Sequence, residues 1–163
     1  YRLIVVVYSL NAIFQVKIML GIYNMTILQK TLSFNTKARQ AHEFTREVQM
    51  FVADSGIGIG LCHLFIQHTS ASLMLCENAD PDVRIDLETF MQSVAPDGDP
   101  MFCHTTEGPD DMPAHIRTLI TNVSLTIPIT DSMCQLGTWQ GIYLWEHRAQ
   151  SHSRNVIMTI NGE

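Results

Sequence analysis

The twelve residues from His104 to His115 (HTTEGPDDMPAH) combine two histidines with three carboxylates, two prolines and a glycine. Proline and glycine interrupt regular structure, so most of this segment is predicted to be a loop, and loops often carry functional side chains. Pro113 suits the first turn of a short helix, with Asp110 and Asp111 at its N-terminal end and His115 facing back toward the loop. A solvated acidic turn before a capped helix explains the same composition without any functional site. A second histidine-bearing segment elsewhere in the chain is what favours a functional site.

That second segment is the most strand-like run of the chain, residues 57–68. Apolar residues occupy both alternating faces of the run, which predicts a strand that is buried on both sides or lies in a sandwich. His68 stands at its end and is followed by the small hydroxyl residues Thr69 and Ser70. A histidine in this position is either a core residue whose ring is hydrogen-bonded or a ligand.

Glu77, Asn78 and Asp80 come shortly afterwards, just before a predicted helix that runs to Val94. Asp80 is a suitable N-cap and Pro81 a suitable first helical residue. Hydroxyl groups, a carboxylate and a helix N-terminus near His68 in sequence predict an anion or metal neighbourhood. The simpler alternative is that Asp80 only caps the helix and that Glu77 is solvated.

The composition of the 163 residues narrows the class of protein. Charged residues make up 16% and hydrophobic residues 46%, which is typical of one globular domain. The net charge is −6 without a basic cluster, which argues against nucleic acid as a partner. The four cysteines lie far apart and form no CxxC pair, as in a reduced cytosolic protein. No glycine-rich phosphate-binding loop is present in the sequence.

Residues 1–24 are apolar but are interrupted by Asn11, Gln15 and Lys17. These polar residues weaken a membrane span, and no clear cleavage site indicates a secretory signal. We interpret 1–24 as an upstream extension or a misplaced start, with a membrane or targeting role as the alternative, and 25–163 as the functional domain.

The hydrophobic pattern of 25–163 predicts an α+β fold. Alternation predicts strands at 26–34, 73–76, 123–129, 133–136, 137–148 and 154–160, besides the run at 57–68. Helical spacing predicts helices at 43–54 and 81–94, and the helix at Pro113 is short. The expected architecture is a single domain with a mostly antiparallel β-sandwich, two longer helices and one short helix.

Four segments together resemble the YjbQ-like family, also called the secondary thiamine-phosphate synthase family. They are HLFIQHTSASL (63–73), ENADPDV (77–83), HTTEGPDDMPAHIR (104–117) and LGTWQGIYLWEHR (136–148). The resemblance covers about 25–163 and implies a small α+β homotrimer that joins a pyrimidine pyrophosphate to a thiazole phosphate. Two features depart from the family: Cys76 stands where an asparagine is common, and 1–24 have no counterpart.

The resemblance also implies a histidine-lined metal pocket, whose motif positions correspond to His68, His104 and His115, with His147 as a weaker candidate. Zinc suits such a set and leaves a position for substrate, whereas magnesium is an option with a pyrophosphate substrate. Candidate catalytic residues are His68, Glu77, Asp111 and Glu146, and candidate ligand-binding residues are Thr69, Ser70, Asn78 and Asp80.

Three functions stay open on the sequence. The first is a low-activity thiamine-phosphate synthase in which the metal and the helix start at Asp80 hold the leaving pyrophosphate. The second is a metal-dependent hydrolase, and the third is a non-enzymatic trimer with a structural metal. The alternating Trp139, Tyr143 and Trp145 are predicted to bury aromatic area at a subunit contact, with an intrachain core as the alternative. We expect a cytoplasmic protein with a small phosphorylated substrate and no membrane or nucleic-acid partner.

Overall fold

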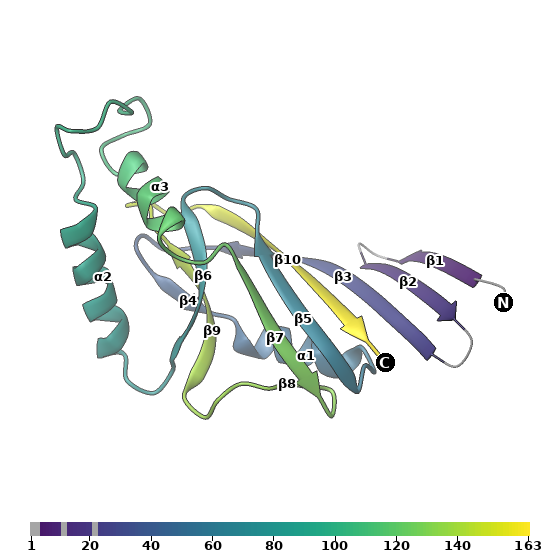
Figure 1. The fold of residues 1–163 in the computed structure, drawn as a ribbon. Helices are drawn as coiled ribbons and strands as arrows, with labels where there is room; N and C mark the ends of the chain where they lie inside the picture. Colours follow the sequence, from purple (N-terminus) through teal and green to yellow (C-terminus); the bar gives the residue numbers. More distant parts are fainter. Residues whose placement is uncertain (1–3, 11–12, 21–22) are drawn as a thin grey trace.

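The computed structural model describes residues 4–10, 13–20 and 23–163, which fold into two antiparallel sheets and three helices (Figure 1). The larger sheet has the strand order β1-β2-β3-β10-β5-β7-β8, and the smaller sheet has the order β4-β9-β6. The strands are β1 (Ile4–Leu10), β2 (Ile13–Leu20), β3 (Tyr23–Asn35), β4 (Ala41–Glu43), β5 (Ile59–Ile66), β6 (Ala71–Glu77), β7 (Ser124–Thr130), β8 (Met133–Cys134), β9 (Gln140–Glu146) and β10 (Ser153–Gly162). The helices are α1 (Thr45–Asp54), α2 (Asp82–Val94) and α3 (Asp111–Leu119). The predicted α+β class is therefore confirmed.

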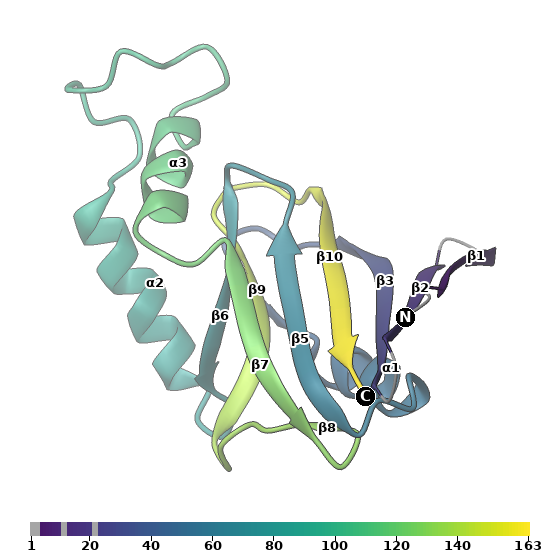
Figure 2. The ribbon, with the colours of Figure 1, turned by 45° about the vertical axis from the view of Figure 1, so that its right-hand side comes forward.

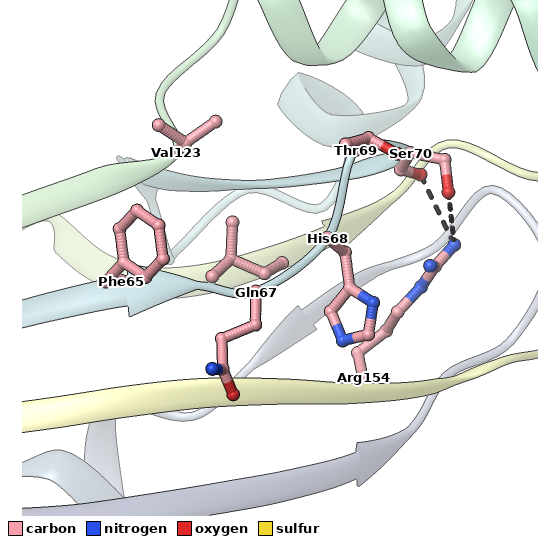
Figure 3. A pocket seen from close by; sticks show the side chains of 8 residues that line it. Phe65, Gln67, His68, Thr69, Ser70, Val123 and Arg154 are labelled. Atoms are coloured by element: carbon pink, nitrogen blue, oxygen red, sulfur yellow. Dashed lines mark hydrogen bonds between the residues drawn. The ribbon is translucent and has the colours of Figure 1, made fainter.

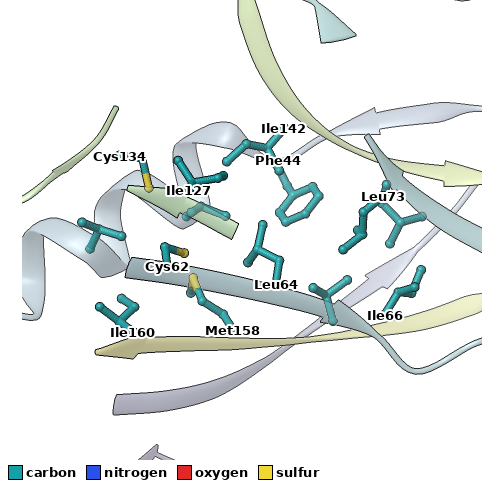
Figure 4. Packing of buried hydrophobic residues seen from close by; sticks show 14 of the residues in the cluster. Phe44, Cys62, Leu64, Ile66, Leu73, Ile127, Cys134, Ile142, Met158 and Ile160 are labelled. Atoms are coloured by element: carbon teal, nitrogen blue, oxygen red, sulfur yellow. The ribbon is translucent and has the colours of Figure 1, made fainter. Parts of the chain in front are cut away.

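The core lies between the two sheets, where alternating side chains from each sheet meet (Figure 4). Cys62, Leu64 and Ile66 of β5 are fully or almost fully buried and face Leu73 of β6 and Leu144 of β9 in one cluster. Helix α1 adds Val48 and Val52 to this cluster. Burial of this alternating apolar set is what fixes the register of the strands.

The opposite face of β5 is not buried in the chain. Ile59, Leu61 and Phe65 are 64%, 42% and 44% exposed, so of the two predicted alternatives the strand in a sandwich holds and the strand buried on both faces does not. Strand β5 also ends at Ile66, which places His68 in the loop that follows. This loop leads to β6 and lies at the same end of the sheets as α3 (Figure 2).

Helices α2 and α3 lie beside the smaller sheet and form a third layer (Figure 2). Tyr143 and Trp145 of β9 are almost completely buried there and pack with Met74 and with Met91 of α2. They belong to the intrachain core, which was the alternative to a subunit contact for these two residues. Trp139 precedes β9 and is 63% exposed.

The N-terminal segment contributes two strands to the larger sheet. Strand β1 pairs with β2, and β2 pairs with β3, both in antiparallel register. Helices of the kind that could span a membrane are absent from the described residues.

Candidate functional site

The loop after α2 and the start of α3 bring two histidines to one carboxylate. The Nε2 atom of His104 lies 2.8 Å from Oδ2 of Asp111, and the Nε2 atom of His115 lies 3.2 Å from the same oxygen. His115 follows Asp111 by one helical turn, which places the two side chains on one face of α3. The Asp111 side chain is 3% exposed, whereas His104 and His115 are 42% and 31% exposed, so the cluster opens toward solvent.

The hydrogen bonds of His115 require either a proton or a metal ion between its ring and Asp111. Its Nδ1 lies 2.9 Å from the carbonyl oxygen of Thr69, which can only accept, so Nδ1 carries the hydrogen. In the neutral ring Nε2 then presents a lone pair to the Asp111 carboxylate. Two lone pairs at 3.2 Å repel unless a proton or a metal ion lies between them. His104, Asp111 and His115 also place one ligand atom each within 4.8 Å of the others, so this donor set fits a divalent metal.

Arg148 fixes the carboxylates from the side away from the histidines. Its Nη1 donates to Oδ1 of Asp111, its Nε donates to Asp110 at 2.9 Å, and its Nη2 donates to the carbonyl of Glu107 at 2.7 Å. The Ala149 amide adds a second bond to Asp110 at 2.8 Å. Burial opposes ionisation of Asp110, but these hydrogen bonds and the Arg148 charge outweigh burial and hold the pKa of that carboxyl below its usual range. Only Oδ2 of Asp111 is therefore directed toward the histidines.

A cavity of about 300 Å³ adjoins the cluster. Its lining is mostly apolar and includes His115, Thr118, Leu119 and Val123, together with His68 and Thr69. A ligand bound in this cavity lies next to the ring of His115. The arrangement therefore offers two imidazoles, one carboxylate and an adjoining space for a small molecule, as a catalytic metal site requires.

The predicted metal set was His68, His104 and His115, but the described chain brings His104 and His115 together with Asp111, and His68 is not part of this cluster. The Nε2 atom of His68 accepts a hydrogen bond from the backbone amide of Asn155 at 2.8 Å, so this nitrogen is not free to bind a metal. Burial and then the charge of Arg154 lower the pKa of His68 below its ordinary value of 6.5.

Glu77, Asn78 and Asp80 lie at the opposite end of β6 from Thr69 and Ser70. Six strand residues, 71–76, separate Ser70 from Glu77, or about 20 Å at the usual rise per residue. The Glu77 side chain accepts a hydrogen bond from the backbone amide of Asp80 at 3.1 Å, and the Asp80 side chain accepts one from the backbone amide of Asp82 at 2.9 Å. The backbone amide of Asn78 donates to the carbonyl of Trp139. Within one chain these three residues form a hydrogen-bonded turn before α2, whose N-cap is Pro81 and not Asp80 as predicted, and their predicted roles at the metal site are not supported. Cys76 belongs to the same distant region.

Glu146 is fully buried and pairs with Arg154, so it is not positioned to touch a substrate as predicted. Its carboxylate accepts hydrogen bonds from Arg154, from the Thr36 hydroxyl at 2.7 Å and from the Arg148 amide at 3.0 Å. Burial raises its pKa, but the hydrogen bonds from Arg154 and the others prevail and lower it below 4.5. The role that fits Glu146 is to position Arg148 and the loop at Ser70, whose oxygens also accept from Arg154.

His147 is likewise buried away from the cluster, with Nε2 2.9 Å from the Ser72 hydroxyl. Burial, reinforced by the charge of Arg117, lowers the pKa of His147 to about 3, which keeps its ring neutral. His147 is also outside the group formed by His104, Asp111 and His115, so its weaker prediction as a metal ligand is not supported within the described chain.

Arg148 and Arg154 are site residues that the sequence reasoning missed. Arg154 had a readable signal, because it shares its side of an alternating strand with Val156, Met158 and Ile160, which are buried. A charged residue at a core-facing position requires a buried partner, and Glu146 at the end of a buried strand is that partner. Arg148 carried no comparable signal.

Comparison with known proteins yields a consistent set of relatives. A family model described as UPF0047 protein YjbQ-like matches residues 30–163. The UPF0047 protein sll1880 of Synechocystis is 47% identical over 135 residues, which cover 83% of this chain and 92% of that protein. The UPF0047 protein YjbQ of Escherichia coli O157:H7 is 47% identical over 136 residues, which cover 83% of this chain and 98% of that protein.

Two solved structures share the fold. A YbjQ-like protein of unknown function from Sulfolobus solfataricus P2 superposes with a TM-score of 0.78 at 22% identity, covering 85% of this chain and 99% of that one. An uncharacterized conserved protein of the yjbq/upf0047 family from Clostridium acetobutylicum superposes with a TM-score of 0.73 at 34% identity, covering 80% and 98%.

Proposed function

The chain belongs to the YjbQ-like UPF0047 family, and on that premise we propose that it is a metal-binding enzyme with thiamine-phosphate synthase activity. The observation that carries the metal part is the shared Oδ2 atom of Asp111, which faces the Nε2 atoms of both His104 and His115. The synthase part rests on the family resemblance. It is supported by the cavity beside His115, which suits a small substrate.

His104, Asp111 and His115 are the residues that would hold the ion. Two imidazoles and one carboxylate suit zinc better than magnesium, which prefers oxygen ligands. A bound divalent cation would supply positive charge to a phosphate leaving group. Thr69 keeps the hydrogen of His115 on Nδ1, and Arg148 keeps Oδ1 of Asp111 occupied, so both side chains are held ready for the ion.

In the proposed reaction the thiazole nitrogen attacks the methylene carbon of the pyrimidine substrate. The new C–N bond forms as the C–O bond to pyrophosphate breaks, and the bonding electrons leave with pyrophosphate. The chain contributes mainly by holding the two substrates together. The helix start at Asp80 is too far away in the same chain to hold the pyrophosphate.

The test is product formation by protein stripped of metal and then loaded with zinc. We expect slow formation of thiamine phosphate from both substrates, loss of activity with chelator and recovery with zinc, measured by fluorescence after oxidation to the thiochrome. Glu77→Gln should keep the wild-type rate because Glu77 lies at the far end of β6. No product from zinc-loaded protein would contradict the synthase.

A metal-dependent hydrolase is the second candidate, and the open, partly exposed histidines support it as well as they support the synthase. The same assay separates the two, because a hydrolase would release pyrophosphate when the pyrimidine substrate is supplied alone. A purely structural metal is less well supported, since a closed four-ligand site would shield the histidines from solvent.

We also propose the homotrimer that the family resemblance implies. Exposed apolar side chains on α2 and at the end of α3 support a subunit contact, among them Phe90 at 61% and Leu119 at 82%. Light scattering should give three times the chain mass of 18.4 kDa, and Phe90→Asp should lower that mass. A wild-type monomer at micromolar concentration would refute the trimer.

A further inference from the structure

A second cavity, of about 400 Å³, adjoins the one beside His115. The two cavities share His68, Thr69 and Val123 in their linings, so they lie side by side. The second cavity is also lined by Phe65, Ser70 and Arg154, and Figure 3 shows the His68 ring beside the Arg154 side chain. None of these side chains belongs to the proposed metal set of His104, Asp111 and His115.

His68 presents a fixed hydrogen-bond donor in this cavity. Its Nε2 accepts the Asn155 amide at 2.8 Å, and an amide N–H can only donate. Nε2 therefore carries the lone pair, and the hydrogen of the neutral ring lies on Nδ1. No described residue accepts a hydrogen bond from Nδ1.

Arg154 presents a second donor. Its Nε and Nη2 atoms are used by Glu146 and by the oxygens of Ser70, at 2.5 to 3.4 Å. Its Nη1 atom has no hydrogen-bond partner among the described residues, although the side chain is only 6% exposed. The ion pair with Glu146 holds the guanidinium rigidly, so the free N–H groups have a defined direction.

We propose that His68 Nδ1–H and Arg154 Nη1–H form an oxyanion-binding site, which holds a phosphate or carboxylate group of the substrate beside the metal cluster. This inference deepens the proposed function, because it identifies residues that recognise the anionic part of the substrate. His68 thus acts as a neutral donor. It is neither a metal ligand nor a general base, because its one lone-pair nitrogen is occupied by the Asn155 amide.

Two substitutions of His68 separate its two nitrogens. The side-chain amide nitrogen of His68→Asn can occupy the place of Nδ1 and keep the donor, but nothing then accepts the Asn155 amide. His68→Gln can place an oxygen near Nε2 and keep that acceptor, but the Nδ1 donor is lost. Arg154 is not substituted, because its removal would leave Glu146 as a buried unpaired charge.

The experiment is a titration of inorganic phosphate into chelator-treated protein, in which the NMR chemical shifts of Thr69, Ser70 and Arg154 monitor binding. We expect saturable binding to wild type and to His68→Asn, and roughly tenfold or greater weakening in His68→Gln. Thermal melting should show the reverse order, with His68→Asn about 2–4 °C less stable than His68→Gln. Equal phosphate affinity in all three proteins, or no binding to wild type, would overturn the proposal.

Sulfate and acetate titrations identify the class of anion. Stronger binding of phosphate and sulfate assigns a phosphoryl group, whereas stronger binding of acetate assigns a carboxylate. Because the protein is metal-free throughout, failure of the anion site is distinguishable from failure of the metal site. The latter is measured separately by zinc titration of His104→Ala.

Discussion

Asp111→Asn is expected to weaken zinc binding by about a hundredfold or more. The carboxylate now gives one oxygen to Arg148 and the other to His104 and His115. Asparagine has one acceptor oxygen, which the Arg148 guanidinium will take, so the amide N–H₂ will face the two imidazoles. The anionic ligand is thereby replaced by a donor, and a cation between the rings loses its charge partner.

The measurement is a competition titration between apoprotein and a zinc-binding dye. Glu107→Gln is the matched control, because Glu107 lies in the same loop but contacts Arg148 through its backbone carbonyl. That variant should bind zinc within about twofold of wild type, as expected for an exposed carboxylate that is not a ligand. If Asp111→Asn binds zinc as tightly as wild type and remains folded by circular dichroism, Asp111 is not a ligand.

Glu146→Gln is expected to lower the free energy of unfolding by about 3–5 kcal/mol. The substitution keeps the shape of the side chain but leaves the Arg154 guanidinium, 6% exposed, without its counter-charge. Chemical denaturation at pH 7 measures the loss. Asp97→Asn is the control, because Asp97 forms an ion pair with Arg39 and its own carboxylate is 42% exposed. This substitution should lower the free energy of unfolding by no more than about 1 kcal/mol.

The effect of Glu146→Gln should depend on pH in one direction. The pKa of Glu146 is lowered in the folded protein, so its carboxylate contributes full stability above its ordinary value of 4.5. That contribution is lost as the pH falls below 4.5 toward the lowered pKa, because wild type then becomes protonated at Glu146. The difference between wild type and variant should therefore shrink in acid. A difference that grows there would contradict the assignment of Glu146 as an ionised partner.

Most of the fold was readable from the sequence because its elements have strong periodic patterns. The predicted helix at 81–94 and the strands at 123–129 and 154–160 match α2, β7 and β10 to within a few residues. Strand β4 was missed, since three residues are too few to show a period. The outer face of β5 was wrongly placed in the core, because exposed Ile59 and Phe65 are indistinguishable in sequence from buried residues.

The site was predictable where its geometry is local. His104, Asp111 and His115 lie within twelve residues, and the helix after the loop sets their spacing. His68 was assigned wrongly because its partner, the Asn155 amide, is 87 residues away and is set by the position of β10 beside β5. Glu77 and Asp80 were placed at the site by proximity in sequence, whereas the extended strand β6 carries them away from it.

Arg148 and Ala149 hold the 104–110 loop by hydrogen bonds, and this has a consequence for how an ion would bind and be released. These contacts are made by the protein alone, so the loop is closed before any cation arrives. Binding free energy is then not consumed in ordering the chain, in contrast to small zinc domains that unfold without metal. Release of the ion likewise does not require the loop to open. The site would therefore be preformed, and the fraction of chains that hold an ion would follow the free concentration of that ion.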